Sequence, residues 1–204
     1  MLENTHAESP EPFRLAVIVG SVREGRFGTT VANWFVGRAA ERPDVSIDVV
    51  DLAQVGLPLT FPAFGVSPAP ETARALQGVT PRLAAADAFV VVTPEYNHSF
   101  PASLKNVIDW HNAEWHAKPI GFVSYGGLSG GLRAVEQLRV VFAELHAATI
   151  RATVSFHGAW EQFDGEGLPI DPAGCNGAAK SMLDQLIWWA HALREARTAR
   201  PYAA

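Results

Sequence analysis

Residues 15–19 (LAVIV) form an unbroken apolar run with no alternating polar side chain. Such a run is typical of a strand that is covered on both faces, as in the middle of a parallel sheet. The run ends at Gly20, where a small polar loop begins, and the apolar spacing of a helix starts near Thr29. A chain that begins with strand, small polar loop and helix is constrained towards an α/β fold with a parallel sheet.

The same order of strand, loop and helix recurs along the chain. Short apolar or alternating runs predict four further strands, at residues 46–51, 88–92, 119–124 and 149–155. Helical spacing predicts a first helix that ends near Pro43 and a second that spans residues 71–86, with a break or a new helix start at Pro81. It predicts three further helices, which begin at Pro101, follow the sequence YGGLSGG, and span about residues 176–197. Four prolines exclude regular structure from residues 52–70. The pattern predicts an α/β three-layer sandwich: a five-stranded parallel sheet of order 2-1-3-4-5 with helices on both faces and its alternating last strand at an edge.

Three polar loops follow the carboxyl ends of predicted strands 1, 3 and 4. In an open parallel sheet this edge binds ligands, next to the point where the strand order reverses. The first loop leads into a helix, whose unpaired N–H groups and positive dipole end suit a phosphate. Ser21, Thr29 and Thr30 add hydroxyl donors, and Arg23 adds a charged fork. The glycine spacing matches neither G-x-G-x-x-G nor G-x-x-x-x-G-K-[ST], which argues against a Rossmann dinucleotide site and a P-loop nucleotidase.

The composition is that of a globular protein. The 204 residues, 48% of them hydrophobic and 18% charged, favour one domain over residues 13–200 behind a flexible N-terminal tail at residues 1–12. A net charge of −5 without any basic run argues against a nucleic-acid partner. No apolar run reaches the roughly 20 residues of a membrane helix, the tail lacks the features of a signal peptide, and Cys175 is the single cysteine. We therefore expect a soluble, cytoplasmic protein with no membrane partner, and no His or Cys spacing predicts a metal site.

Three segments carry a resemblance to a known family: GSVREGRFGTTVANW, TPEYNHSFPASLKNVIDW and SYGGLSGGLRA, in this order. They resemble the signature loops of the NAD(P)H-dependent FMN reductases, a family with a flavodoxin-like fold that includes quinone, azo-dye and chromate reductases. The resemblance implies a flavoprotein oxidoreductase that uses FMN as cofactor and NADPH or NADH as co-substrate. It further implies a homodimer or homotetramer, and a small-molecule electron acceptor: a quinone, an azo compound, a metal oxyanion or free flavin.

Carried over residue by residue, the resemblance assigns cofactor-binding positions and no catalytic side chain, because the flavin carries the chemistry. Ser21 and Arg23 would hold the FMN phosphate, helped by Gly28 and Thr29. The isoalloxazine ring would lie between two walls, formed by Pro94, Glu95, Tyr96 and Asn97 on one side and by Ser124, Tyr125, Gly126 and Gly127 on the other. Arg26 and Gly28 stand where relatives often have Ser and Asn, and no role is assigned to Arg26.

Several residues have a second interpretation. Glu95 is equally consistent with a solvated charge or a helix-dipole partner, and Tyr96 with packing on the end of its own strand. The glycines of the third loop are expected to provide backbone without side chains, so that a nicotinamide can reach one face of the ring: Gly126, Gly127, Gly130 and Gly131. Four tryptophans are interpreted as core or subunit-contact residues: Trp110, Trp115, Trp188 and Trp189.

Two other functions are compatible with the sequence. A flavodoxin-like electron-transfer module would bind the same cofactor but would shield it from NAD(P)H. A serine hydrolase is suggested by residues 127–131 (GLSGG), which match the G-x-S-x-G elbow with Ser129 as nucleophile. The hydrolase would need His191 as its base, inside an apolar helix beside Trp188 and Trp189.

Overall fold

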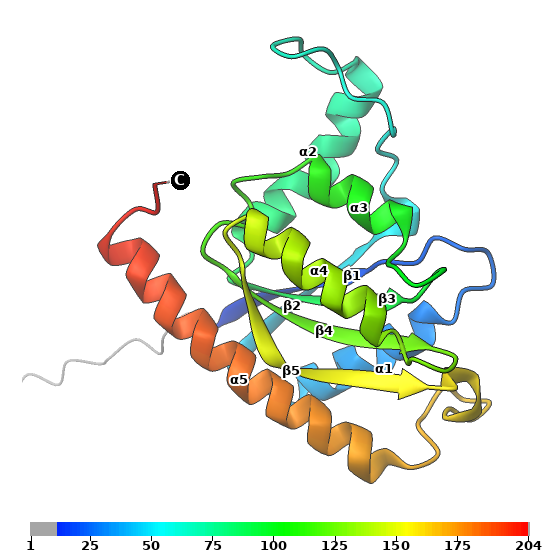
Figure 1. Cartoon of the computed structure of the whole chain (residues 1–204). Coiled ribbons are helices and arrows are strands. Elements are labelled where there is room, and N and C mark those ends of the chain that lie inside the picture. The colour runs from blue at the N-terminus through cyan, green and yellow to red at the C-terminus, as the bar shows by residue number, and fades with distance from the viewer. Residues whose placement is uncertain (1–11, 204) are drawn as a thin grey trace, which may run out of the picture.

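The computed structural model describes residues 12–203 of the chain. It contains a five-stranded parallel sheet of order β2-β1-β3-β4-β5 (Figure 1). The strands are β1 (Phe13–Val19), β2 (Val45–Asp51), β3 (Ala88–Pro94), β4 (Pro119–Gly126) and β5 (Ala148–His157). The predicted strand order and the edge position of the last strand are confirmed. The expected tail at residues 1–12 lies outside the described residues except for Pro12.

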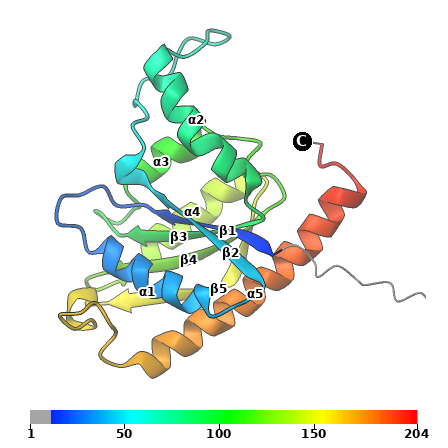
Figure 2. The ribbon, with the colours of Figure 1, turned by 180° about the vertical axis from the view of Figure 1, so that it is seen from behind.

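Helices cover both faces of the sheet (Figures 1 and 2). One face carries α1 (Gly28–Ala40) and α5 (Pro172–Ala199), and the other carries α2 (Pro70–Ala85), α3 (Ala102–Asp109) and α4 (Leu132–Glu144). The central strand β3 contributes side chains to the core on both faces of the sheet. Val90 and Val92 pack towards α1 and α5, whereas Phe89 and Val91 pack towards the other three helices. A strand buried on both faces needs apolar residues at every position, which explains the unbroken runs in the sequence.

Two predicted helix boundaries are wrong. α2 continues through Pro81, because the residue four positions earlier, Gln77, is exposed, so water can bond the carbonyl that Pro81 leaves without a donor. α5 begins at Pro172 rather than Asn176, because the Asp171 side chain accepts a hydrogen bond from the Ala173 N–H at 3.3 Å and so caps the helix.

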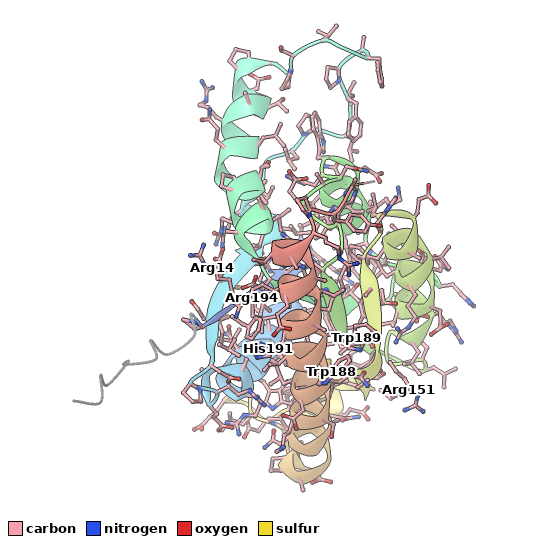
Figure 3. All side chains as sticks on the ribbon, turned by 90° about the vertical axis from the view of Figure 1, so that its left-hand side faces the viewer. Arg14, Arg151, Trp188, Trp189, His191 and Arg194 are labelled. Atoms are coloured by element: carbon pink, nitrogen blue, oxygen red, sulfur yellow. The ribbon has the colours of Figure 1, made fainter. Side chains whose placement is uncertain are left out.

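Two other expectations were too coarse. The connection at residues 52–69 contains a short 3₁₀ turn at Leu52–Gln54 before its irregular part. The tryptophans also differ in their burial: Trp115 is fully buried, whereas Trp188 and Trp189 lie on the exposed side of α5 (Figure 3). For these two the core interpretation is wrong, and a subunit contact stays a prediction.

The loops that leave the carboxyl ends of the strands gather at one end of the molecule, on the right in Figure 1. They include the loop at residues 20–27, the loop at residues 95–101 and the loop at residues 127–131. Between residues 12 and 203, no helix is both long and apolar enough to span a lipid bilayer.

Candidate functional site

The loop between β1 and α1 is held against the end of β2 by Arg26. The Arg26 guanidinium donates from Nη1 to Asp51 Oδ1 at 2.7 Å and from Nη2 to Asp51 Oδ2 at 2.5 Å. Nη1 also donates to the Ser21 carbonyl oxygen at 2.7 Å. Only 15% of the Arg26 side chain and 16% of the Asp51 side chain are exposed. Arg26, which the sequence left without a role, therefore ties the loop to the sheet.

Hydroxyl groups meet beside the N-terminus of α1. Ser21 is buried, and its Oγ lies 2.8 Å from Tyr96 Oη. The Tyr125 hydroxyl approaches from β4 and lies so close to Gly28 that a Cβ there would come nearer than 3.0 Å to it. Burial raises the pKa of the Tyr125 phenol, and a hydrogen bond with Ser21 opposes that shift. The phenol therefore stays protonated and can donate, and Gly28 is the residue that makes room for it.

Arg23 of this loop and Thr29 of α1 differ in their availability to a ligand. Arg23 is exposed, and its side chain forms no ion pair with any residue in the described part of the chain. The Thr29 hydroxyl donates back to the Arg26 carbonyl at 3.4 Å and is half-buried. A half-buried helix N-terminus with neighbouring hydroxyls and one exposed guanidinium is suited to bind a phosphate.

The loop after β3 contains a tight turn over residues 96–99. The Tyr96 N–H donates to the Ser99 carbonyl at 2.8 Å, and the Ser99 N–H donates to the Tyr96 carbonyl at 3.1 Å. Asn97 and His98 occupy the turn with φ of 49° and 72°. Asn adopts this left-handed region more readily than most residues. The turn presents Tyr96 towards the first loop. Pro94 is the last residue of β3 and is buried.

Glu95 joins this loop to the N-terminus of α4. Its carboxylate accepts hydrogen bonds from Ser129 Oγ at 2.6 Å, from the Arg133 N–H at 3.1 Å and from the Arg133 guanidinium at 3.2 Å. Burial opposes ionisation, but these donors outweigh it and hold the pKa of Glu95 below its usual value. The contacts support the interpretation of Glu95 as a partner of the helix dipole. A contact between Glu95 and a flavin stays a prediction.

The glycines of the third loop fall into two pairs. Gly130 and Gly131 are buried, and a Cβ on Gly131 would lie 2.7 Å from the Ser124 Cβ. Ser124 Oγ donates to the Gly130 carbonyl at 2.8 Å, which fastens the loop to β4. The expectation that Gly130 and Gly131 form an open surface is therefore wrong, because they are packed on the sheet.

The other pair, Gly126 and Gly127, is half-buried at the end of β4. A Cβ on Gly127 would meet Trp160 at 3.6 Å, an ordinary contact. Trp160 lies in a 3₁₀ turn at Ala159–Glu161 and is 62% exposed. No sequence pattern pointed to Trp160, although it follows the last strand at the same edge of the sheet.

The hydrolase alternative is contradicted by the position of its proposed base. Ser129 Oγ donates to Glu95, whereas the His191 ring packs edge-on against Phe13 with ring centroids 4.1 Å apart. Phe13 is the first residue of β1, so His191 lies at the amino end of the sheet (Figure 3). Ser129 lies at the carboxyl end, so these residues cannot form a triad. In residues 12–203 there is also no group of three His, Cys, Asp or Glu side chains placed to hold a metal ion.

The sheet order and the phosphate-type loop at the strand-order reversal define a flavodoxin-like, mononucleotide-binding domain. A family model described as NADPH-dependent FMN reductase matches residues 13–161, and the chain belongs to this family. The NAD(P)H-dependent FMN reductase C4B3.06c of Schizosaccharomyces pombe is 36% identical over 122 residues, which cover 58% of this chain and 60% of the relative.

A second relative aligns over more of its length. The probable NADPH:quinone oxidoreductase 2 of Oryza sativa subsp. japonica is 34% identical over 178 residues, covering 80% of this chain and 82% of the relative. Among solved structures, the flavoenzyme FerB of Paracoccus denitrificans has a TM-score of 0.68 at 22% identity. The match covers 86% of this chain and 98% of FerB, and it supports the fold.

Proposed function

We propose that this protein transfers a hydride from NAD(P)H to bound FMN and passes the electrons to a small acceptor. Bound FMN supplies the redox chemistry, since it accepts a hydride and can then be reoxidised by a second substrate. The chain's own contribution is to bind, orient and align, and no side chain has to act as an acid or base in the first step. Family membership supports this proposal, and the acceptor class is inferred from relatives named as quinone and FMN reductases.

The observation that carries the proposal is the set of donors beside the N-terminus of α1. Ser21 and Tyr96 offer hydroxyls within hydrogen-bond distance of each other. Arg23 is exposed and free of ion pairs within residues 12–203. This donor set fits a phosphate monoester, whose three oxygens accept several hydrogen bonds and favour a guanidinium. We therefore place the FMN phosphate at this loop.

The ring would then lie between the loop at residues 95–101 and the end of β4. The hydrogen bonds of Glu95 to Ser129 and Arg133 fix the separation of these two walls. Gly126 and Gly127 leave backbone groups accessible, and backbone N–H and C=O groups can approach the polar edge of a flat ring. A site of this kind selects flat molecules, which suits a quinone, an azo compound or free flavin, and it leaves both NADPH and NADH as hydride donors.

We further propose that the protein assembles as a homodimer through the connection at residues 52–69. This segment exposes Leu59, Phe61, Phe64 and Val66. The first part of the same segment lines a hollow of about 430 Å³, whose apolar lining includes Leu52, Val55, Leu57 and Leu59 together with Val22 and Val107. A two-fold axis would place Phe61, Phe64 and Val66 of each copy against the hollow of the other. A homotetramer would need a second surface, for which Trp188 and Trp189 are candidates.

Sedimentation tests the dimer. Phe64→Ser should shift the sedimentation coefficient towards the monomer, whereas Trp188→Ser should leave a dimer intact. A cytoplasmic location is also part of the proposal, supported by the single cysteine of the chain.

Flavin uptake followed by an acceptor screen tests the function. Flavin-free protein should bind FMN more tightly than riboflavin, measured by quenching of flavin fluorescence. The FMN-loaded, NADPH-reduced protein should then be reoxidised by quinones under nitrogen. Protein that binds neither flavin would refute the proposal, and equal affinity for the two flavins would refute the phosphate placement.

A further inference from the structure

The contacts of Arg26 distinguish it from Arg23, the other arginine of the same loop. Arg26 makes two parallel hydrogen bonds to the carboxylate of Asp51, and both side chains are mostly buried. Such a fork-to-fork pair fixes the orientation of both planar groups. The charge of Arg26 is therefore balanced by Asp51, whereas Arg23 is exposed.

Asp51 is placed to connect three segments of the chain. It is the last residue of β2, and it is the register partner of Val19, the last residue of β1. Its Oδ1 also accepts a hydrogen bond from the Ala53 N–H at 3.1 Å, which starts the turn at Leu52–Gln54. The loop at residues 20–27 begins at the end of β1, beside this carboxylate. Near the other end of the loop, Arg26 binds the carboxylate and so holds the loop against the end of β2.

The hydrogen bond from Arg26 to the Ser21 carbonyl extends this constraint to the groups that would bind the phosphate. It fixes the backbone of the residue whose hydroxyl contacts Tyr96 and accepts a 3.4 Å hydrogen bond from the Arg23 N–H. A loop ordered before binding does not lose backbone conformational freedom when a ligand arrives, which would otherwise weaken affinity.

We propose that the Arg26–Asp51 pair is a positioning device for the FMN phosphate. Arg26 does not bind the phosphate; it holds Ser21 and the following N–H groups in the conformation that does. The inference rests on the proposed placement of FMN at this loop.

Asp51→Asn separates positioning from direct binding. If the pair positions the loop, the substitution weakens FMN binding by at least about tenfold and changes riboflavin binding by less than about twofold. If Arg26 bound the phosphate itself, removing its negative partner would leave FMN affinity unchanged or increase it, and that result would overturn the proposal. The asparagine keeps an oxygen for the Ala53 N–H, so the turn at Leu52–Gln54 is retained.

A second pair on the same strand provides the matched control. Asp48 of β2 accepts a hydrogen bond from Arg82 Nε of α2 at 2.8 Å, away from the loop. Asp48→Asn should leave the dissociation constants of both flavins unchanged. Arg26→Ala should weaken FMN binding as Asp51→Asn does, and the double variant should be no weaker than either single one, because both remove the same interaction.

Amide hydrogen exchange provides a readout that needs no bound flavin. In flavin-free Asp51→Asn, amides of residues 21–27 should exchange faster than in the wild type, while those of β3 should not change. Should Arg26→Ala fail to fold, Arg26→Lys keeps the charge but loses the fork and should show the same FMN-specific loss. Unchanged exchange in the loop, or equal losses for FMN and riboflavin, would refute positioning. Failure of the wild type to bind FMN would instead refute the proposed function.

Discussion

Gly28→Ala tests how much the close approach of Tyr125 to the first residue of α1 contributes to stability. A Cβ at position 28 would lie nearer than 3.0 Å to Tyr125 Oη, 3.3 Å from Tyr125 Cζ and 3.6 Å from Ser21 Cβ. Tyr125 is 6% exposed and cannot swing into solvent. Overpacking of a buried site costs about 1–3 kcal/mol, and replacing glycine by alanine in a helix returns about 0.5–1 kcal/mol. The midpoints of these ranges give an expected net loss of about 1 kcal/mol in the free energy of unfolding, and the upper limit is about 2.5 kcal/mol.

Urea denaturation followed by tryptophan fluorescence measures this loss, with two controls. Gly37 lies in the same helix with no atom within 4 Å of its Cβ position, so Gly37→Ala should stabilise the protein by about 0.5–1 kcal/mol. In a Tyr125→Phe background the clashing oxygen is absent, and adding Gly28→Ala should then cost much less than it does in the wild type. If Gly28→Ala is as stable as the wild type, or if its cost persists in the phenylalanine background, the proposed contact is wrong.

Three further substitutions test other parts of the molecule. Arg23→Ala should weaken FMN binding by about 1.5–3 kcal/mol, the range for charge-assisted hydrogen bonds, and should leave riboflavin binding unchanged in parallel titrations. Gly127→Val should retain FMN but slow its reduction by NADPH by at least about tenfold in stopped-flow absorbance, since the side chain would occupy the approach to the ring. Burial lowers the pKa of Lys118 to about 8, below its value in the unfolded chain, so the unfolded state binds more protons between these two values and stability rises with pH there. From about pH 7 to about pH 9.5, the wild type should therefore gain about 2 kcal/mol in unfolding free energy relative to Lys118→Met, measured by denaturation at both pH values.

The parallel sheet could be predicted because burial on both faces leaves a simple pattern in the sequence. Residues 15–19 and 88–92 contain no polar side chain, and the sheet places both runs in its interior. The three loops could be located for the same reason, since each begins where such a run ends. The approximate position of the candidate site therefore follows from the ends of the strands.

Contacts between loops were harder to predict. The pair of Arg26 and Asp51 joins residues 25 positions apart, and the sequence signals it only once strands 1 and 2 are placed side by side. Gly131 packs on Ser124 of β4, and Gly130 packs on Ser155 and His157 of β5. These partners lie in strands outside the loop, so no local pattern distinguishes the two glycines from Gly126 and Gly127.

The predicted helix boundaries are wrong at two positions where exposure or a capping contact outweighs the local preference of a residue type. Pro81 is tolerated inside α2 because the affected carbonyl is on an exposed turn, and exposure is not visible in a single residue type. α5 begins at Pro172 because Asp171 caps it. Glycine and proline residues around Asp171 are typical of a loop, so the sequence did not indicate this cap.

The proposed function requires that the chain holds FMN so that NAD(P)H reduces it directly. Anaerobic mixing of the FMN-loaded wild type with NADPH in a stopped-flow spectrometer tests this requirement. We expect rapid bleaching of the visible flavin absorbance, with about one equivalent of NADPH consumed per flavin. A protein that retains FMN but shows no bleaching on mixing with NADPH or NADH would not be a reductase, and the result would identify an electron-transfer module instead.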